Sequence, residues 1–390
     1  MIDLEEHRTQ ADKMTSDELL SNTISCLRFP LCVIIVFLHF NLTGGLGIQG
    51  VKHGIDNPGW YFFIIRFVSE TLGGLCVPLF FFISGFLFFY GKDFNGDVYK
   101  KKLMSRAKTL LIPYILWNFI ALMWKSKRFL PIVSSYYQPA EIHFSIIRLI
   151  NTFFCYNDNN GIIVSSSLSE ISSAIYPING PLWYVRDLMV MVVISPIIYI
   201  LIRRMRGWFV TLLSLVWFFS PILFQLGDYR GLFIIALFFF SWGAFYSIQK
   251  ENIVVLFRKY KFLWFVYLVF AIVNTLIRNM NYNVFVDNTG IIIGVISSFV
   301  IASYWIEYRG GKVNLLLANS SFFIFALHQM FLGDIARFAF IMFNIPENNP
   351  FIMLVFYFVV PIFTIFVCYT LYKCLKLFTP LLCSLLTGGR

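Results

Sequence analysis

Charged side chains are scarce in this chain, and most of those present are basic. Aspartate, glutamate, lysine and arginine make up 13% of the 390 residues, whereas hydrophobic residues make up 58%. Soluble globular domains contain about 25% charged residues, so this composition excludes that class. Apolar runs of about twenty residues recur along the chain, which is the length that crosses a bilayer as an α-helix. The sequence therefore predicts an all-α, polytopic integral membrane protein.

The chain also lacks any patterned use of cysteine. Its seven cysteines are scattered and form neither a CxxC pair nor a His/Cys cluster with metal spacing. Most lie in apolar stretches, where a free thiol packs as a small hydrophobe. We therefore expect no disulfide framework, no metal site and no bound cofactor. The net charge of +11 does not indicate a nucleic-acid partner, because Lys and Arg accumulate in the cytosolic loops of membrane proteins.

The basic residues set the expected orientation of the spans. Residues 91–108 include six Lys or Arg residues, the densest basic run in the chain, which places this loop in the cytosol. We expect about ten transmembrane helices, with both termini cytosolic. Their approximate ranges are 24–42, 72–90 after an interfacial lead-in at 60–66, 109–124, 182–201, 208–225, 231–248, 262–279, 289–306, 315–342 and 351–372.

The predicted membrane domain, residues 23–376, leaves short flanking segments. Residues 1–22 are expected to form a polar cytosolic tail without the apolar core of a signal peptide, and residues 377–390 a C-terminal tail. The connection 125–180 is mostly polar and is expected on the exterior. Within it, the apolar piece 144–156 is too short for a span, so we expect it to be interfacial or re-entrant.

Two ionisable residues stand in the first apolar stretch. Arg28 and His39 are eleven residues apart, so on an α-helix they share a face and are separated by ~16.5 Å along the axis. Ionisable residues within a span are costly and mark functional sites. This spacing places a cation near one membrane surface and an imidazole deep in the span, where they could hold a long ligand with a charged head. Alternatively, Arg28 snorkels to the interface and His39 bonds a neighbouring helix.

Four further strings follow this pair along the chain. They are Val77–Phe86 (VPLFFFISGF), Ile112–Tyr114 (IPY), Gly180–Leu188 (GPLWYVRDL) and Ser321–His328 (SFFIFALH). Together with Arg28-x10-His39, and in this order, they resemble the integral-membrane acyltransferase-3 family over roughly residues 20–380. The chain looks most like the stand-alone, fucose 4-O-acetylase-like branch, because it lacks the exterior SGNH esterase-like domain of some relatives. The family's usual Arg-x-x-Arg before the third span is matched only loosely, by Lys101, Lys102, Arg106 and Lys108.

The resemblance implies transfer of an acyl group, by default acetyl, from cytosolic acyl-coenzyme A. The implied acceptor is a hydroxyl of a bacterial cell-surface glycan or of its lipid-linked precursor, and the implied location is the inner membrane. A sugar hydroxyl is a poor nucleophile, so a neutral imidazole must take its proton, and His39 is the candidate. Glu70 could orient or charge-balance His39, or face water in the headgroup region. The phosphates of the donor suit the basic side chains of Arg28, Lys101, Lys102, Arg106 and Lys108.

Candidates for the acceptor side lie in two later strings. Trp183 could belong to the interfacial aromatic belt or stack on a sugar ring. Arg186 and Asp187 are adjacent opposite charges in a span, a pattern that usually faces a polar cavity. His328 could bond core groups or the acceptor. The small pair Ser84–Gly85 favours close helix packing.

An exporter of a glycan or lipid-linked sugar is the alternative function. Transport would favour two pseudo-symmetric halves with broken helices at matching positions, and no such pairing is evident in the sequence. An exporter also has no evident use for a histidine on the same helical face as an arginine. Consumption of acetyl-coenzyme A by membranes that contain the protein would separate the two functions.

Overall fold

The computed structural model describes residues 14–44, 59–130, 134, 140–156, 160–165, 176–224, 228–280, 283–346 and 348–389. Within these ranges the chain is almost entirely helical. The strands are β1 (Ala140–Ile142) and β2 (Ile163–Ser165), which pair antiparallel as a short hairpin. The predicted all-α class is therefore confirmed.

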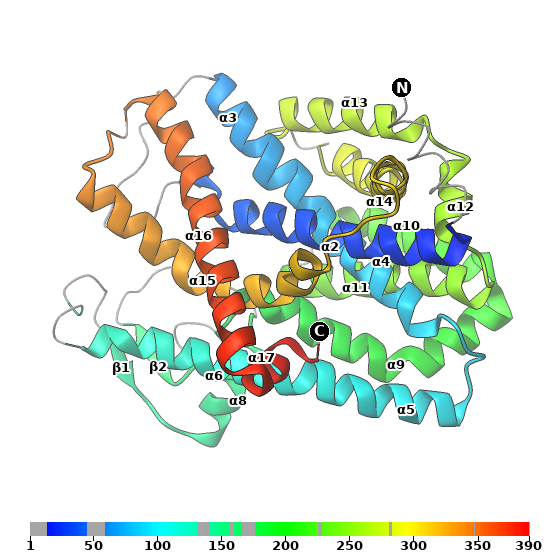
Figure 1. Cartoon of the computed structure of the whole chain (residues 1–390), viewed down its shortest axis with the longest axis horizontal. Coiled ribbons are helices and arrows are strands. Elements are labelled where there is room, and N and C mark those ends of the chain that lie inside the picture. The colour runs from blue at the N-terminus through cyan, green and yellow to red at the C-terminus, as the bar shows by residue number, and fades with distance from the viewer. Residues whose placement is uncertain are drawn as a thin grey trace.

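Seven helical segments of the described chain are long and apolar enough to cross a membrane. They are α2 (Ser16–His39), Gly59–Phe89, Gly96–Phe129, Gly180–Met205, α14 (Asn283–Tyr308), α15 (Leu315–Met342) and α16 (Pro350–Phe378). Three shorter helices are also apolar, namely α10 (Gly207–Phe224), α11 (Asp228–Ile248) and α13 (Leu263–Leu276). Figure 1 shows these helices packed together. Each overlaps one of the predicted spans, and the polytopic membrane class is confirmed.

Two of the long segments contain wider π-helical turns. The first consists of α3 (Gly59–Ile65), η2 (Arg66–Leu72) and α4 (Gly73–Phe89), and the second of α5 (Gly96–Arg106), η3 (Ala107–Leu111) and α6 (Ile112–Ser126), which a 3-10 turn, η4 (Lys127–Phe129), extends. Helix continues through η2, so no helix break separates the predicted lead-in at 60–66 from the span at 72–90, and through η3, so helix already precedes the predicted start of the next span at 109. Such π-helical turns are frequent at functional sites. Glu70 lies in η2, and η3 directly follows Arg106.

Helix α2 begins earlier than the apolar pattern predicts. Thr15 accepts a hydrogen bond from the backbone N–H of Glu18 (3.2 Å), and the Glu18 carboxylate accepts one from the N–H of Thr15 (2.9 Å). This capping box fixes the start of the helix at Ser16. The helix therefore begins before the predicted span 24–42 and ends before residue 42. As a result Arg28, rather than His39, lies near the middle of the helix, and His39 is its last residue.

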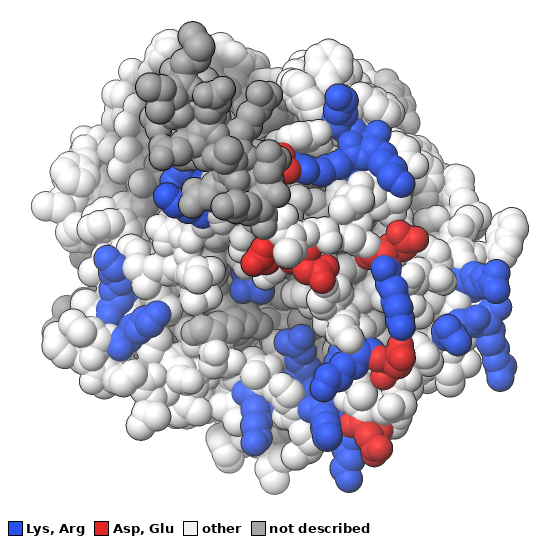
Figure 2. Space-filling view, turned by 45° about the vertical axis from the view of Figure 1, so that its right-hand side comes forward, with Lys and Arg blue, Asp and Glu red and all other residues white. Residues whose placement is uncertain are grey.

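Segments predicted to be cytosolic lie together at one end of the bundle. A cavity of about 460 Å³ there is lined by Lys92 from the α4–α5 link, Arg203 near the end of α9 (Trp183–Met205) and Lys250 after α11. At the same end, Asn22 of α2 donates to the Gly311 carbonyl in the α14–α15 link (3.2 Å). Figure 2 brings this end forward and shows many Lys and Arg side chains, with Asp and Glu among them. The grouping agrees with the common side predicted for these loops.

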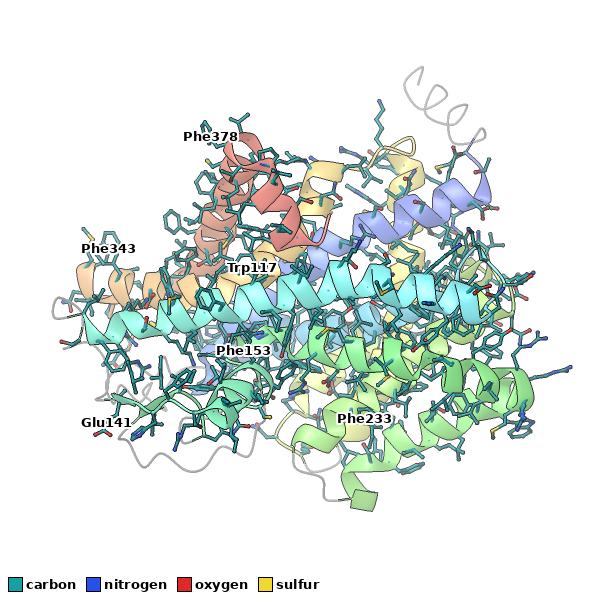
Figure 3. All side chains as sticks on the ribbon, turned by 90° about the horizontal axis from the view of Figure 1, so that it is seen from below. Trp117, Glu141, Phe153, Phe233, Phe343 and Phe378 are labelled. Carbon is teal, nitrogen blue, oxygen red and sulfur yellow. The ribbon has the colours of Figure 1, made fainter. Side chains whose placement is uncertain are left out.

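The connection 125–180 and the C-terminal tail both contain helices. In the described part of the connection, α8 (Ile146–Phe154) leaves Ile146 and Ile147 exposed, as expected of an interfacial helix. The predicted tail includes α17 (Pro380–Thr387), which packs against α6. The indole N–H of Trp117, labelled in Figure 3, donates to the Leu386 carbonyl (2.9 Å). The remaining described elements are short. They are the turns η1 (Leu42–Gly44) and η5 (Gly180–Leu182) and helix α12 (Ile253–Arg258).

Helices α4 and α11 meet at two reciprocal glycines. A Cβ atom at Gly85 would overlap the carbonyl of Phe240, and a Cβ atom at Gly243 would overlap the carbonyl of Phe82. Small residues allow backbones to approach this closely inside a membrane. The packing role predicted for Gly85 is confirmed, whereas its neighbour Ser84 faces the cavity described next.

Candidate active site

A cavity of about 250 Å³ lies inside the bundle, between α2, α4, α9 and α15. Helix α2 contributes Arg28, Cys32 and Ile35 to its wall. These residues follow one another at helical spacing along one face. His39 is the next residue on that face and is exposed. The face predicted to carry both Arg28 and His39 is therefore the face that lines a cavity.

Helix α15 provides a second stripe of the same kind. Ala318, Ser321 and Phe325 line the cavity, and His328 continues their face one turn further. The Cys32 thiol donates to the Ser321 carbonyl (3.2 Å) and ties α15 to α2. The two stripes converge on the two histidines, whose ring centroids are 5.2 Å apart. His39 and His328 are far apart in the sequence, and the fold brings them together.

The two histidines differ in their surroundings. His39 is exposed, whereas His328 has 0% of its surface exposed. The Nδ1 atom of His328 lies 3.2 Å from the Ile324 carbonyl oxygen, which is the core hydrogen bond that the sequence left open. Its Nε2 atom is buried and has no hydrogen-bond partner among the described residues. His328 therefore satisfies the core with one nitrogen and keeps the other unbonded.

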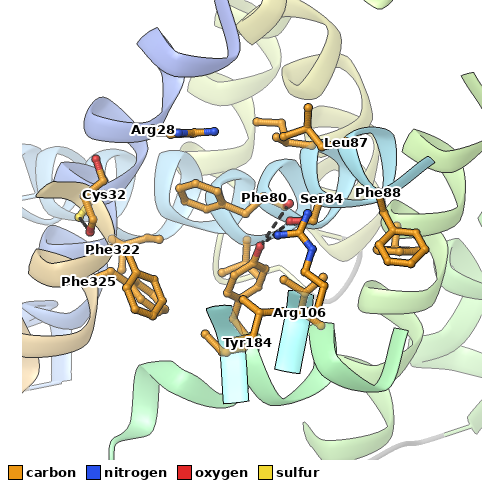
Figure 4. Close-up of a pocket in the computed structure, with 18 of the residues that line it drawn as sticks. Arg28, Cys32, Phe80, Ser84, Leu87, Phe88, Arg106, Tyr184, Phe322 and Phe325 are labelled. Atoms are coloured by element: carbon orange, nitrogen blue, oxygen red, sulfur yellow. Dashed lines mark hydrogen bonds between the residues drawn. The ribbon is translucent and has the colours of Figure 1, made fainter. Parts of the chain in front are cut away.

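Two of the predicted donor-binding cations line this cavity. Arg28 comes from α2 and Arg106 from the end of α5, and both are half-buried (Figure 4). Within the described chain, neither guanidinium forms a hydrogen bond or an ion pair. Because a half-buried cation without a counter-ion favours an anion nearby, this end of the cavity suits phosphate groups.

The other members of the basic run point elsewhere. Lys101 and Lys108 are exposed and do not line the cavity. Lys102 donates to the carbonyl of Phe88 and lies over the ring of the same residue, 5.3 Å from its centroid. Of the residues that loosely match the family's Arg-x-x-Arg, the structure brings Arg106 to the site.

Sequence analysis missed one polar residue of the cavity wall. Tyr184 lies within the string Gly180–Leu188, but its uncharged side chain gave no signal beside the charges at 186 and 187. Its hydroxyl lies 2.9 Å from the Ser84 hydroxyl and donates to the Phe80 carbonyl at 3.3 Å (Figure 4). The cavity wall therefore carries two hydrogen-bonded hydroxyl groups in addition to its two arginines.

Glu70 lies beside the end of α2 without bonding to the His39 ring. One carboxylate oxygen accepts from the Asn41 amide (2.9 Å) and the Thr43 hydroxyl (3.3 Å). The other oxygen forms an ion pair with Nε of Arg278 (2.9 Å). Glu70 thus holds the chain just beyond His39 against the end of α13. In the described part of the chain no hydrogen bond joins Glu70 to His39.

The predicted acceptor-side charges lie in a different cavity. Arg186 Nε bonds Asp187 Oδ1 (2.8 Å), and Arg186 Nη1 donates to the Phe154 carbonyl (2.8 Å). This buried pair lines a space of about 740 Å³ between α5, α8 and α9, which shares Arg106 with the first cavity. The sequence predicted that this pair faces a polar cavity. That prediction is wrong, because most of the residues that line the space are apolar. Trp183 packs against a phenylalanine of α4, with ring centroids 6.2 Å apart.

The first cavity has the layout of a site for a long, anionic molecule. Arg28 and Arg106 supply its positive charge, and His39 lies ~16.5 Å from Arg28 along α2 by helix geometry. An exposed neutral imidazole can accept a proton from a hydroxyl. Among the described residues, no group of three or more His, Cys, Asp or Glu side chains could hold a metal ion.

Comparison with known proteins covers nearly the whole chain. Residues 22–373 match a family model described as an acyltransferase domain. Over 386 residues the chain is 25% identical to the succinoglycan biosynthesis protein ExoH of Rhizobium meliloti (strain 1021). The matched region covers 96% of this chain and 94% of that protein. No solved structure matches the chain. The family match includes every residue that lines the first cavity.

Proposed function

Because the chain belongs to this acyltransferase family, we propose that it is a multi-pass membrane O-acyltransferase of the bacterial inner membrane. It moves an acyl group, by default acetyl, from cytosolic acyl-coenzyme A to a hydroxyl of a cell-surface glycan or its lipid-linked precursor. The likeness to ExoH supports a glycan acceptor, because that protein is named for succinoglycan biosynthesis. The earlier resemblance to the acetylase-like branch supports acetyl as the group transferred.

The observation that carries the proposal is the face of α2 on which Arg28, Cys32 and Ile35 line the cavity and His39 follows one turn further. Arg28 and Arg106 suit the phosphates of coenzyme A, because guanidinium groups form strong bidentate bonds to phosphate. The ~16.5 Å between Arg28 and His39 is comparable to an extended pantetheine arm. A donor held at the arginines would therefore present its thioester near the histidines without crossing the membrane.

Apart from the glycan hydroxyl and the thioester, the proposed step requires only one protein group that gains and loses a proton, which is the base. A lone-pair nitrogen of His39 takes the proton of the glycan hydroxyl while the hydroxyl oxygen attacks the thioester carbonyl carbon. The carbon–sulfur bond then breaks, and the coenzyme A thiolate leaves with the proton from His39. The products are an acyl ester of the glycan and free coenzyme A. His39 can meet the acceptor because it is exposed.

Membranes that contain the protein provide the test. They are incubated with acetyl-coenzyme A labelled in the acetyl group and with the envelope glycan of the producing cells. We expect release of free thiol and an equal amount of alkali-labile label in the glycan. The double variant Arg28→Ala/Arg106→Ala, checked for equal abundance, should release neither. Passage of unlabelled glycan across the membrane without thiol release would overturn the proposal and favour the exporter.

A further inference from the structure

Two imidazoles lie together on the helix faces of α2 and α15 that line the cavity, one turn beyond its lining residues, and one of the two is accessible. His39 is exposed, whereas His328 is wholly buried. Their ring centroids are 5.2 Å apart with the planes tilted by 42°, and His328 also lies 6.2 Å from the ring of Phe325. A glycan hydroxyl can therefore reach His39 but not His328. Any part that His328 takes in the reaction must pass through His39.

The hydrogen bonds of His328 define which of its nitrogens carries a proton. Its Nδ1 atom lies 3.2 Å from the Ile324 carbonyl oxygen. Since a carbonyl oxygen only accepts, the hydrogen of the neutral ring is on Nδ1, and Nε2 is left as an acceptor. This Nε2 is buried and has no partner among the described residues. Because a buried unsatisfied acceptor is destabilising, it favours any donor that comes within reach.

We propose that His328 is a positioning residue for His39, through acceptance of a His39 ring N–H at its Nε2 atom. The inference rests on the proposed acyl transfer. In this structure the two rings are close but not hydrogen-bonded, and rotation of the exposed His39 ring would turn its N–H toward Nε2. The other His39 nitrogen then keeps its lone pair toward the acceptor hydroxyl.

His328 would thus take the place that a carboxylate holds in a Ser-His-Asp triad. From the sequence, Glu70 was the candidate for orienting His39. Its carboxylate is instead engaged by Asn41 at 2.9 Å and by Arg278 at 2.9 Å. The side chain that lies against the His39 ring is His328.

The arrangement changes how His39 carries the proton during transfer. When the hydroxyl oxygen attacks the thioester carbon, its proton passes to the lone-pair nitrogen of His39. His39 then holds a proton on each nitrogen until the leaving thiolate takes one of them. Acceptance of the inner N–H by His328 stabilises this cation and fixes the orientation of the ring. His328 itself neither gains nor loses a proton.

Substitution of His328 by asparagine or by glutamine tests the roles of its two ring nitrogens separately. The amide of asparagine reaches about as far as Nδ1, so His328→Asn keeps a donor for the Ile324 carbonyl and removes the acceptor. The amide of glutamine reaches about as far as Nε2, so His328→Gln restores an acceptor oxygen. We expect His328→Asn to lower kcat at least ~10-fold at unchanged KM for acetyl-coenzyme A, and His328→Gln to recover part of the loss.

Two controls make the comparison specific. His143→Asn makes the same substitution at an exposed histidine that pairs with Glu141, and it should leave kcat unchanged. The double variant His39→Ala/His328→Asn should be no slower than His39→Ala alone, because His328 acts only through His39. Abundance and thermal midpoint are measured for each variant on the same membranes.

Several outcomes would overturn the positioning role. Wild-type kcat in His328→Asn, equal kcat in the Asn and Gln variants, or a further loss in the double variant would each do so. Failure of both single variants to accumulate would make His328 structural. Absence of transfer by the wild-type protein would instead overturn the proposed function, and the inference with it. The activities of the wild-type enzyme and of His39→Ala distinguish these two failures. If the wild type is active and His39→Ala is inactive, the proposed function stands and only the role of His328 is overturned.

Discussion

Arg28 of α2 and Arg106 of α5 line one cavity, and within the described chain neither guanidinium has a hydrogen-bond or ion-pair partner. Like charges that share a half-buried space repel each other, so the arrangement is unfavourable when the cavity holds no anion. A phosphate group bound in this cavity would accept strong charge-assisted bonds from a guanidinium group that it contacts. Two unpartnered guanidinium groups in one cavity therefore fit anion binding better than they fit an interfacial anchor.

Arg106→Ala should weaken donor binding more than the loss of any neighbouring lysine. Removal of one charge-assisted contact to phosphate costs about 1.5–3 kcal/mol, so KM for acetyl-coenzyme A should rise about 10-fold or more. Lys108→Ala is the matched control, since Lys108 is exposed two residues away and does not line the cavity. Donor titration of both variants in membranes tests this. An equal effect of the two substitutions would return the donor site to the basic run as a whole.

A bulky side chain at Ser84 should block the cavity. Ser84 lines the space and bonds the Tyr184 hydroxyl at 2.9 Å. Ser84→Phe fills part of the volume, so we expect acyl-coenzyme A binding to fall below detection while the protein still accumulates. Ser84→Ala removes the hydroxyl but keeps the space, and should bind donor within ~10-fold of wild type, because a neutral hydrogen bond contributes about 0.5–1.5 kcal/mol. Normal donor binding by Ser84→Phe would show that the donor lies elsewhere.

Gly243→Ala should destabilise the bundle, although Gly243 itself does not line the cavity. Its new Cβ would overlap the Phe82 carbonyl and force α4 and α11 apart. Overpacking of this kind costs about 1–3 kcal/mol. Gly74→Ala is the matched control, because nothing lies within 4 Å of a Cβ at Gly74. Thermal midpoints in detergent should fall for Gly243→Ala alone, and a fall of equal size in Gly74→Ala would contradict the close crossing.

The sequence predicted the parts of the fold that depend on local composition. Apolar length located the spans, and the spacing of Arg28 and His39 predicted their shared face, because both are set by a single helix. The start of α2 was missed because the capping box at Thr15 lies in a polar segment that apolarity does not reveal. The π-helical turns η2 and η3 were missed because no residue pattern marks them.

The parts of the site that depend on tertiary packing could not be predicted. His328 is more than two hundred residues from His39 in the sequence, and only the pairing of α2 with α15 brings their rings together. Likewise, the sequence does not show which basic side chain faces the cavity. Lys101 and Lys108 are exposed, whereas Arg106 is half-buried and lines the cavity. Glu70 and His39 are close in the fold, yet Asn41 and Arg278 determine where the carboxylate bonds.

The proposed sidedness predicts opposite labelling of two sites. Residue 93 lies in the basic link between α4 and α5, and residue 165 in β2 of the connection predicted to be exterior. Asp93→Cys and Ser165→Cys are introduced separately into a cysteine-free background. A membrane-impermeant thiol reagent added to intact cells should label residue 165 and spare residue 93, because Lys and Arg accumulate on the inner side. Labelling of residue 93 alone would invert the topology.

The most direct test of the central claim is acetyl incorporation into surface glycan by His39→Gln. Glutamine keeps a hydrogen-bonding side chain of similar reach but cannot usefully accept the proton. If His39 is the general base, the variant should reach the membrane at normal abundance and lose roughly 10²–10⁴-fold in transfer, as His39→Ala should. A structural histidine would be partly rescued by glutamine. Near-normal acetylation by His39→Gln, with protein level checked on the same membranes, would contradict the account and leave the reaction without a base.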